Sequence, residues 1–438
     1  MSTVVAIDFG TSRSAWALSI QGLAESAIVV RVPLGSDLSP ACTKTETAVL
    51  LNTDDYSVHV GPRPNFTASD KEEHLPAGKS MLFRWFKMEL CRKGGFQTVD
   101  DPVAISECGR TLPLLIVMAA VLRFFKDDAL AHSSNVTGVD YVTTDVTWVV
   151  TIPAIYDDFA RRFMRVAAHK AGLINAVDSP RLGLCLEPEA ACLTMSIKDI
   201  PDLSQPGTRT MILDCGGGTV DITTHEVLST NPLCLKELCP PKGGPWGSTY
   251  VDSEFMEWLK VFLGAEIFAR FRRLSPFLDL LIQWEAQKIK FGGKDDEIVK
   301  LRMSAFLQTN GDQPVFDGVK IQVMYEDTDG WQVGGRKYSL VLPSPLVRSF
   351  FAPVIDKITA CLDDLKGDSS LRDLKYAFLV GGFSSSPLVQ AAARTSLEGD
   401  ECKVIVAVKP EVAIVKGAVL FANDSKTFRT RKARLTYG

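Results

Sequence analysis

The chain has 438 residues, of which 46% are hydrophobic and 23% charged, a composition typical of a globular protein with about two to four compact units. Its formal net charge of −4 gives no reason to expect a general attraction to nucleic acid. The longest apolar stretch, residues 112–125, contains Arg123 and is shorter than the roughly 20 residues of a membrane span, so we expect no membrane span.

The N-terminal stretch and the cysteines indicate a cytoplasmic protein. The chain reaches Asp8 after a short apolar run with no charged region before it, which does not fit a signal peptide. The ten cysteines are scattered without a CxxC pair and predict no disulfide framework. Four of them lie in apolar runs and are expected to be small buried hydrophobes: Cys185, Cys192, Cys215 and Cys361.

In chain order, the sequence begins with strands. Residues 3–8 and 15–20 predict a hairpin, and residues 27–32 a third strand. Residues 41–111 are more polar and rich in turns, apart from a helix-compatible patch at 81–90. We interpret this segment as a subdomain inserted into the first lobe.

Strands and helices then alternate. The expected elements are a long helix at 112–131, a central parallel strand at 145–152, a helix at 159–171 capped by Asp157 or Asp158 and ended by Gly172, and a strand end running into a helix at 184–194. This alternation favours an α/β fold.

The second half repeats the plan. The expected elements are a strand hairpin at 211–227, helices at 249–262 and 278–291, a helix at 345–365, a strand at 376–380 and a last helix at 410–421. We therefore predict two lobes, residues 1–195 and 196–422, the second with an insertion at about 243–342. The basic end, residues 423–438, reads either as the start of a missing C-terminal region or as a solvated terminus.

One local pattern occurs in both halves. Asp8-Phe-Gly10-Thr11 and Asp214-Cys-Gly216-Gly217-Gly218-Thr219 each follow an apolar strand and precede another. Glycine turns let backbone N–H groups approach an anion, Thr11, Ser12 and Thr219 add hydroxyls, and the two aspartates supply charge for magnesium. The repeat predicts a polyphosphate and its magnesium held between two lobes.

A third glycine turn follows the strand at 376–380. Gly381-Gly382-Phe-Ser384 can lie against a ribose and base, because glycine permits close approach. The alternative is a tight strand–helix connection with no ligand.

Together these stretches resemble the ATPase domain of the 70-kDa heat-shock protein family, within the actin-like superfamily. The matching segments run in family order over about residues 1–422: 6–11, 150–154, 187–191, 214–221, 380–382 and 410–418. Residues 243–252, with Gly247 and Ser248, and the ending 434–438 resemble the divergent type-12 branch. The resemblance implies a two-lobed actin-like fold in which each lobe is a duplicated mixed-sheet core with an inserted subdomain.

The resemblance also implies roles. Asp8 and Asp214 would orient magnesium-bound waters, and Thr219 and Asp221 would stand beside the γ-phosphate. Glu187 would position the attacking water or take its proton, and Lys87 would face the phosphates. Read without the family, Glu187 could cap a helix, Lys87 could lie on a solvated helix face and Asp221 could simply end a hairpin.

Three positions depart from the family pattern. Mainstream relatives hold adenine between two arginines, and the matching positions here are Ile289 and Ser385, while Glu285 and Lys288 of the ribose contacts are retained. We expect weaker or less selective adenine binding. A tyrosine of the first phosphate turn is replaced by Arg13, which either reaches a phosphate or lies on the surface.

The leading hypothesis is a magnesium-dependent, slowly hydrolysing ATP/ADP switch of chaperone-like ancestry, a monomer with possible protein clients or co-chaperones. A nucleotide sensor without turnover, a small-molecule kinase and a filament former are the alternatives.

Overall fold

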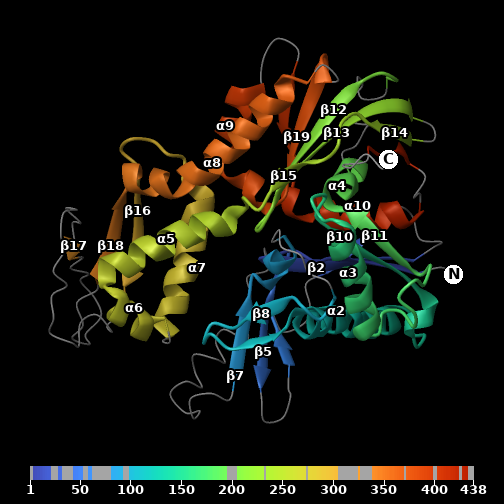
Figure 1. Cartoon of the computed structure of the whole chain (residues 1–438), viewed down its shortest axis with the longest axis horizontal. Coiled ribbons are helices and arrows are strands. Elements are labelled where there is room, and N and C mark those ends of the chain that lie inside the picture. Colours follow the sequence, from blue (N-terminus) through green and yellow to red (C-terminus); the bar gives the residue numbers. More distant parts are fainter. Residues whose placement is uncertain are drawn as a thin grey trace.

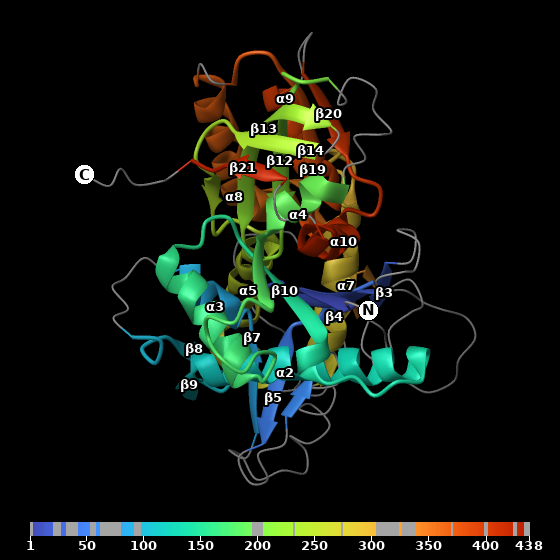
Figure 2. The same ribbon diagram turned by 90° about the vertical axis from the view of Figure 1, so that its right-hand side faces the viewer.

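The computed structural model describes residues 3–20, 28–31, 43–52, 58–61, 80–91, 98–194, 205–230, 233–272, 275–303, 324–325, 338–368, 371–397, 402–423 and 427–432. Two mixed sheets, each with helices on both faces, form the two halves of the molecule (Figures 1 and 2). The predicted α/β class with two lobes is confirmed.

The first sheet carries the N-terminal hairpin. Its strands are β1 (Thr3–Asp8), β2 (Arg13–Ile20), β3 (Val29–Arg31), β4 (Thr45–Glu46), β10 (Val146–Ile152) and β11 (Leu182–Leu186), in the order β11-β10-β1-β2-β3 with β4 on β2. β1 is antiparallel to β2 and parallel to β10, which confirms the predicted central parallel strand. Helices α2 (Leu114–Thr137) and α3 (Asp158–Lys170) share one apolar core with this sheet.

The second sheet repeats this topology. Its strands are β12 (Arg209–Cys215), β13 (Val220–Thr230), β14 (Leu233–Glu237), β15 (Lys242–Gly244), β19 (Leu374–Val380), β20 (Lys403–Val406) and β21 (Phe428–Thr430), in the order β20-β19-β12-β13-β14-β21 with β15 on β13. β12 is antiparallel to β13 and parallel to β19. Helices α8 (Ser344–Lys366) and α9 (Pro387–Leu397) share its outer core.

Two helices join the halves. α4 (Glu187–Thr194) and α10 (Pro410–Asn423) lie between the sheets (Figure 2), and their apolar faces form a third core with residues of both. At their crossing, a Cβ on Gly417 would stand 1.6 Å from the Ala190 carbonyl oxygen. Only a glycine lets the two backbones approach this closely.

We therefore expect Gly417→Ala to lower the free energy of unfolding by about 2–3 kcal/mol, because the methyl group forces two packed helices apart. Denaturant titration measures the change. Gly183→Ala is the matched control, since its Cβ would meet the neighbouring Val149 and Phe421 at ordinary distances of 3.7 and 3.8 Å. Equal midpoints for the two variants would contradict the close approach of α4 and α10.

Smaller elements project from each half (Figure 1). In the first half they are β5 (Ala48–Asn52), β6 (Val58–Val60), β7 (Ser80–Arg84), β8 (Val103–Ile105) and β9 (Thr111–Pro113). In the second they are α5 (Ser248–Leu263), α6 (Ala265–Phe271), α7 (Ser275–Lys290), β16 (Ile298–Met303), β17 (Met324–Tyr325) and β18 (Tyr338–Pro343). Most of them fall within the two predicted insertions, although β9 extends past residue 111 and β18 past residue 342, and the boundaries stay a prediction.

Several local expectations were wrong. The patch at 81–90 is not one helix: β7 is followed by the 3-10 helix η2 (Phe86–Cys91), and Trp85 between them has a φ of 54°. α2 runs six residues past the predicted end at 131, to Thr137, where Gly138 has a left-handed φ of 70°. α6 and the 3-10 helices η3 (Thr143–Asp145) and η7 (Gly382–Ser385) were not predicted. The cap of α3 is confirmed, since Asp157 accepts the Ala160 N–H at 2.8 Å.

The described part of the C-terminal segment adds a short strand to the second sheet while residues 429–432 stay exposed, and both interpretations of the basic end stay predictions. β21 pairs with β14, and Arg431 donates two hydrogen bonds to the buried Glu189 carboxylate, at 2.7 and 2.8 Å. Residues 434–438, on which part of the family resemblance rested, lie outside the described residues.

The expectations for the cysteines and for membrane-spanning helices can be compared with the structure. Cys185, Cys192 and Cys215 are buried as predicted, whereas Cys361 on α8 is only half-buried. None of the nine cysteines in the described ranges forms a disulfide. Of the helices that the structure describes, none combines the length and apolar character needed to cross a membrane.

Candidate nucleotide site

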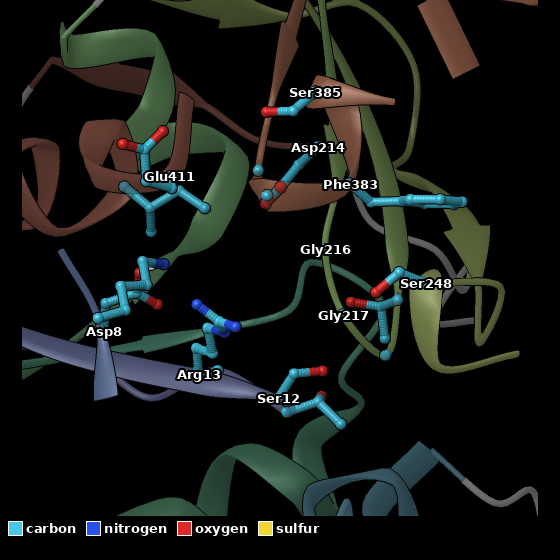
Figure 3. A pocket seen from close by; sticks show the side chains of 18 of the residues that line it. Asp8, Ser12, Arg13, Asp214, Gly216, Gly217, Ser248, Phe383, Ser385 and Glu411 are labelled. Atoms are coloured by element: carbon cyan, nitrogen blue, oxygen red, sulfur yellow. Dashed lines mark hydrogen bonds and ion pairs between the residues drawn. The ribbon is translucent and has the colours of Figure 1, made fainter. Parts of the chain in front are cut away.

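A cavity of about 310 Å³ lies between the two halves (Figure 3). Most of the predicted site residues line it: Asp8, Gly10, Thr11, Ser12, Arg13, Lys87, Glu187, Asp214, Gly216, Gly217, Gly218, Thr219, Ser248, Glu285, Lys288, Gly381 and Gly382. The wall also contains residues that were not predicted as ligand contacts: Thr43, Lys44, Ile289, Phe383, Ser385, Ser386, Glu411 and Ile414.

The two glycine turns lie directly against each other. A Cβ on Gly217 would stand 2.2 Å from Ser12 Oγ, and one on Gly218 would stand 2.4 Å from Thr11 Oγ1. Larger residues at these positions of the second turn would push the first turn away. The repeated sequence pattern therefore forms one continuous wall built from both halves.

Asp8, at the end of β1, is held by two donors. Thr151 Oγ1 on β10 donates to Asp8 Oδ1 at 3.1 Å, and Lys44 Nζ donates to Oδ2 at 2.5 Å. The threonine is itself fixed, since it accepts the Phe9 N–H at 3.3 Å. The carboxylate consequently has a defined position at the cavity wall.

Asp214, near the end of β12, has no such partners. The side chain is 2% exposed, and neither carboxylate oxygen has a hydrogen-bond partner. Burial raises its pKa well above the ordinary value, and the nearby Glu187, Asp221 and Asp8 carboxylates raise it further. A buried carboxylate without donors is costly, so this group is suited to a cation.

Lys87 and Glu187 form a buried pair. Lys87 Nζ donates to Glu187 Oε1 at 2.7 Å and to the Phe9 carbonyl at 2.5 Å, and its side chain is 2% exposed. Burial raises the pKa of Glu187, although the lysine opposes the shift. Lys87 is thus not on a solvated helix face, and Glu187, the first residue of α4, faces the cavity.

Three predicted site residues do not line the cavity. Asp221 is fully buried behind it and accepts the Ile155 N–H at 2.8 Å; burial, with the charge of Glu187, raises its pKa to about 7. Ser384 donates its hydroxyl to the Gly381 carbonyl at 2.7 Å, so it braces the turn. Gly247 donates its N–H to the Gly218 carbonyl at 3.0 Å and supports the phosphate turn from behind.

The side of the cavity near α7 has both polar and apolar walls. Lys288 is buried and donates to Asp252 at 2.7 Å, and Glu285 lies 2.6 Å from its ammonium. Ile289, one residue on, is 40% exposed and lines the cavity, as does Ser385. The two positions that the family resemblance matched to arginines are therefore an isoleucine and a serine in this wall.

Arg13 enters the cavity. Figure 3 shows its side chain pointing from the first turn into the space between Asp8 and the second turn. Arg13 is also an exposed residue, so the choice between a phosphate contact and a surface position stays a prediction.

The side chains present fit a magnesium–polyphosphate ligand. In the described ranges, no group of three or more histidine, cysteine or acidic side chains could hold a metal ion by itself. Magnesium is commonly held by one or two carboxylates, retained waters and the substrate phosphates, and Asp8 with the unpartnered Asp214 supplies that set.

Two lobes of repeated topology around a cavity walled by glycine turns define an actin-like, ATPase-type nucleotide-binding protein. No family model matches the chain. Heat shock 70 kDa protein 12A is 30% identical over 490 residues in both Mus musculus and Homo sapiens, which covers 99% of this chain and 71% of the relative. Human heat shock 70 kDa protein 12B is 29% identical over 497 residues, covering 100% and 71%. The chain belongs to the 70-kDa heat-shock protein family, in its divergent type-12 branch.

Proposed function

We propose that the chain binds ATP with magnesium and hydrolyses it slowly, and that its lobes close on ATP and relax after hydrolysis. One observation carries the proposal: both glycine turns and the Lys87–Glu187 pair line the same cavity. As a chaperone-like switch, the chain would pass this change of shape to protein clients or co-chaperones.

The proposed chemistry is largely positioning, as in other phosphoryl transfers. The backbone N–H groups and hydroxyls of the two turns hold the phosphates, and Thr219 and Arg13 lie at the same wall. Glu187 orients the attacking water and accepts its proton, while Lys87 holds that carboxylate in place. Magnesium, when bound through Asp8 and Asp214, would neutralise phosphate charge.

The binding part of the proposal is tested by a thermal-shift series with ATP, ADP and GTP, each with and without magnesium. A ligand at 100 times its Kd should stabilise the fold by about 2.7 kcal/mol. Phosphate release in the same preparations tests hydrolysis. Absence of any shift with all three nucleotides would refute the site, and a shift without phosphate release above a Lys87→Ala control would refute the ATPase.

The second outcome defines an alternative function, a nucleotide sensor without turnover. Ile289 and Ser385 at the cavity wall favour it, because weak base binding is compatible with sensing a concentrated nucleotide. A small-molecule kinase remains a further alternative, and stimulation of phosphate release by a metabolite would support it.

Ile289→Arg is expected to tighten ATP binding, because a guanidinium over an aromatic base contributes about 0.5–2 kcal/mol, or about twofold to thirtyfold in Kd. Calorimetry measures the change. Ile282→Arg is the matched control, since this isoleucine lies on the same helix, is 55% exposed and does not line the cavity. A sub-micromolar wild-type Kd with strong rejection of GTP would contradict our view that base binding is weak.

A further inference from the structure

Lys44 lies at the cavity wall, in a segment that the sequence analysis did not connect with the site. Its ammonium donates to Asp8 Oδ2 at 2.5 Å, and its side chain is 12% exposed. This pair joins residues far apart along the first half of the chain, so its position depends on how the segment around Lys44 is held.

The segment that follows Lys44 is hydrogen-bonded to the first glycine turn and the strand after it. β4, which begins directly after Lys44, pairs with β2 so that Thr45 stands opposite Ser14. Thr47 donates its N–H to the Ser12 carbonyl at 2.8 Å, and the Thr47 and Ser14 hydroxyls lie 2.7 Å apart. The backbone beside Lys44 is therefore held in a fixed position next to the first glycine turn.

The Lys44 ammonium acts on more than one carboxylate. Besides Asp8, its charge lowers the pKa of Glu187 and of Asp214, against the larger raising effect of burial on both groups. The positive charge of one lysine thus acts on three acidic side chains of the site. Of these, Asp214 has no hydrogen-bond partner for either carboxylate oxygen.

The other two lysines at the wall are more deeply buried. The side chains of Lys87 and Lys288 are each 2% exposed, whereas that of Lys44 is 12% exposed. Lys44 has greater access to the cavity, and an ammonium carries three N–H donors, so it can contact a phosphate oxygen while keeping Asp8.

We propose that Lys44 is a phosphate-binding residue, and that its ammonium supplies part of the charge that a divalent cation otherwise supplies, so that nucleotide binding tolerates the removal of magnesium. This inference rests on the proposed nucleotide site. The ligand class is a nucleoside polyphosphate, either metal-bound or metal-free.

The test is calorimetric titration with adenylyl imidodiphosphate, a triphosphate analogue that resists hydrolysis, in magnesium and in EDTA. The quantity compared is the ratio of the Kd in EDTA to the Kd in magnesium. We expect Lys44→Gln to raise this ratio at least about tenfold, equivalent to about 1.4 kcal/mol, by weakening the EDTA form. Lys44→Arg keeps the charge and should return the ratio to within about twofold of wild type. Lys260→Gln, on the exposed face of α5, is the matched control with no expected change.

The outcomes separate this inference from the proposed function. Tight wild-type binding in magnesium with an unchanged ratio in Lys44→Gln would overturn the role of Lys44 alone. Loss of wild-type affinity in EDTA by more than about 100-fold would overturn it too, and that result needs no folded variant. Absence of wild-type binding in either buffer would overturn the nucleotide site itself.

Discussion

Glu187→Gln is expected to reduce phosphate release at least about 100-fold while leaving nucleotide affinity within about threefold, because an amide keeps the shape of the side chain but is not a base. The amide oxygen can still accept the Lys87 ammonium that the wild-type carboxylate binds at 2.7 Å, so the local structure is preserved. Single-turnover phosphate release measures the chemical step, and calorimetry measures binding separately.

Glu189→Gln provides the matched control for this experiment. Glu189 lies two residues further along α4 and is also buried, but it binds Arg431 and does not line the cavity. We expect this variant to release phosphate normally per folded molecule, because the carboxylate that it replaces does not face the ligand. Equal loss of phosphate release in both variants would assign the effect to α4 packing and remove Glu187 from the chemistry.

The central part of the fold could be predicted because its signals are local. The run at 145–152 is apolar almost throughout, as expected for a strand buried on both faces, and β10 occupies this position. The two strand–Asp–Gly–Thr patterns likewise predicted two hairpins, which form β1–β2 and β12–β13. Local patterns of this kind specify the element and its neighbour in the hairpin without information from the rest of the chain.

The rest depended on contacts between distant parts of the chain. Nothing near Lys44 in the sequence marks it as a neighbour of Asp8; that pairing follows from the registration of β4 on β2. Arg431 belongs to a basic end in the sequence, and only the structure shows that its guanidinium binds the Glu189 carboxylate. Conversely, the position of Ser384 after a glycine turn predicted a ligand contact. In the structure its hydroxyl donates to the Gly381 carbonyl of the same turn instead. Tertiary contacts decide such cases.

The unpartnered Asp214 carboxylate leads to the second large prediction, which concerns stability. Folding raises the pKa of this group well above its ordinary value, through burial first and then through the charges of Glu187, Asp221 and Asp8. In the window between the unfolded and folded pKa values, the folded protein binds more protons than the unfolded chain. The contribution of Asp214 to the free energy of unfolding must therefore fall as pH rises from about 4, and Asp221, whose folded pKa is about 7, acts in the same direction.

We expect Asp214→Asn to raise the free energy of unfolding at pH 7, because it removes a charge that burial disfavours, and to flatten the fall of this free energy between about pH 4 and pH 7. Denaturant titrations in EDTA across this range measure both effects. Asp356→Asn, on the exposed face of α8, controls for the loss of one negative charge.

The Asp214→Asn variant should also bind nucleotide less tightly in magnesium. We expect the ratio of the Kd in EDTA to the Kd in magnesium to fall at least about tenfold, because the cation loses one of its two carboxylates. A gain in stability together with that loss would mean that the buried charge is retained for the ligand at a cost to the fold; a variant less stable than wild type at pH 7 would show instead that the carboxylate supports the structure.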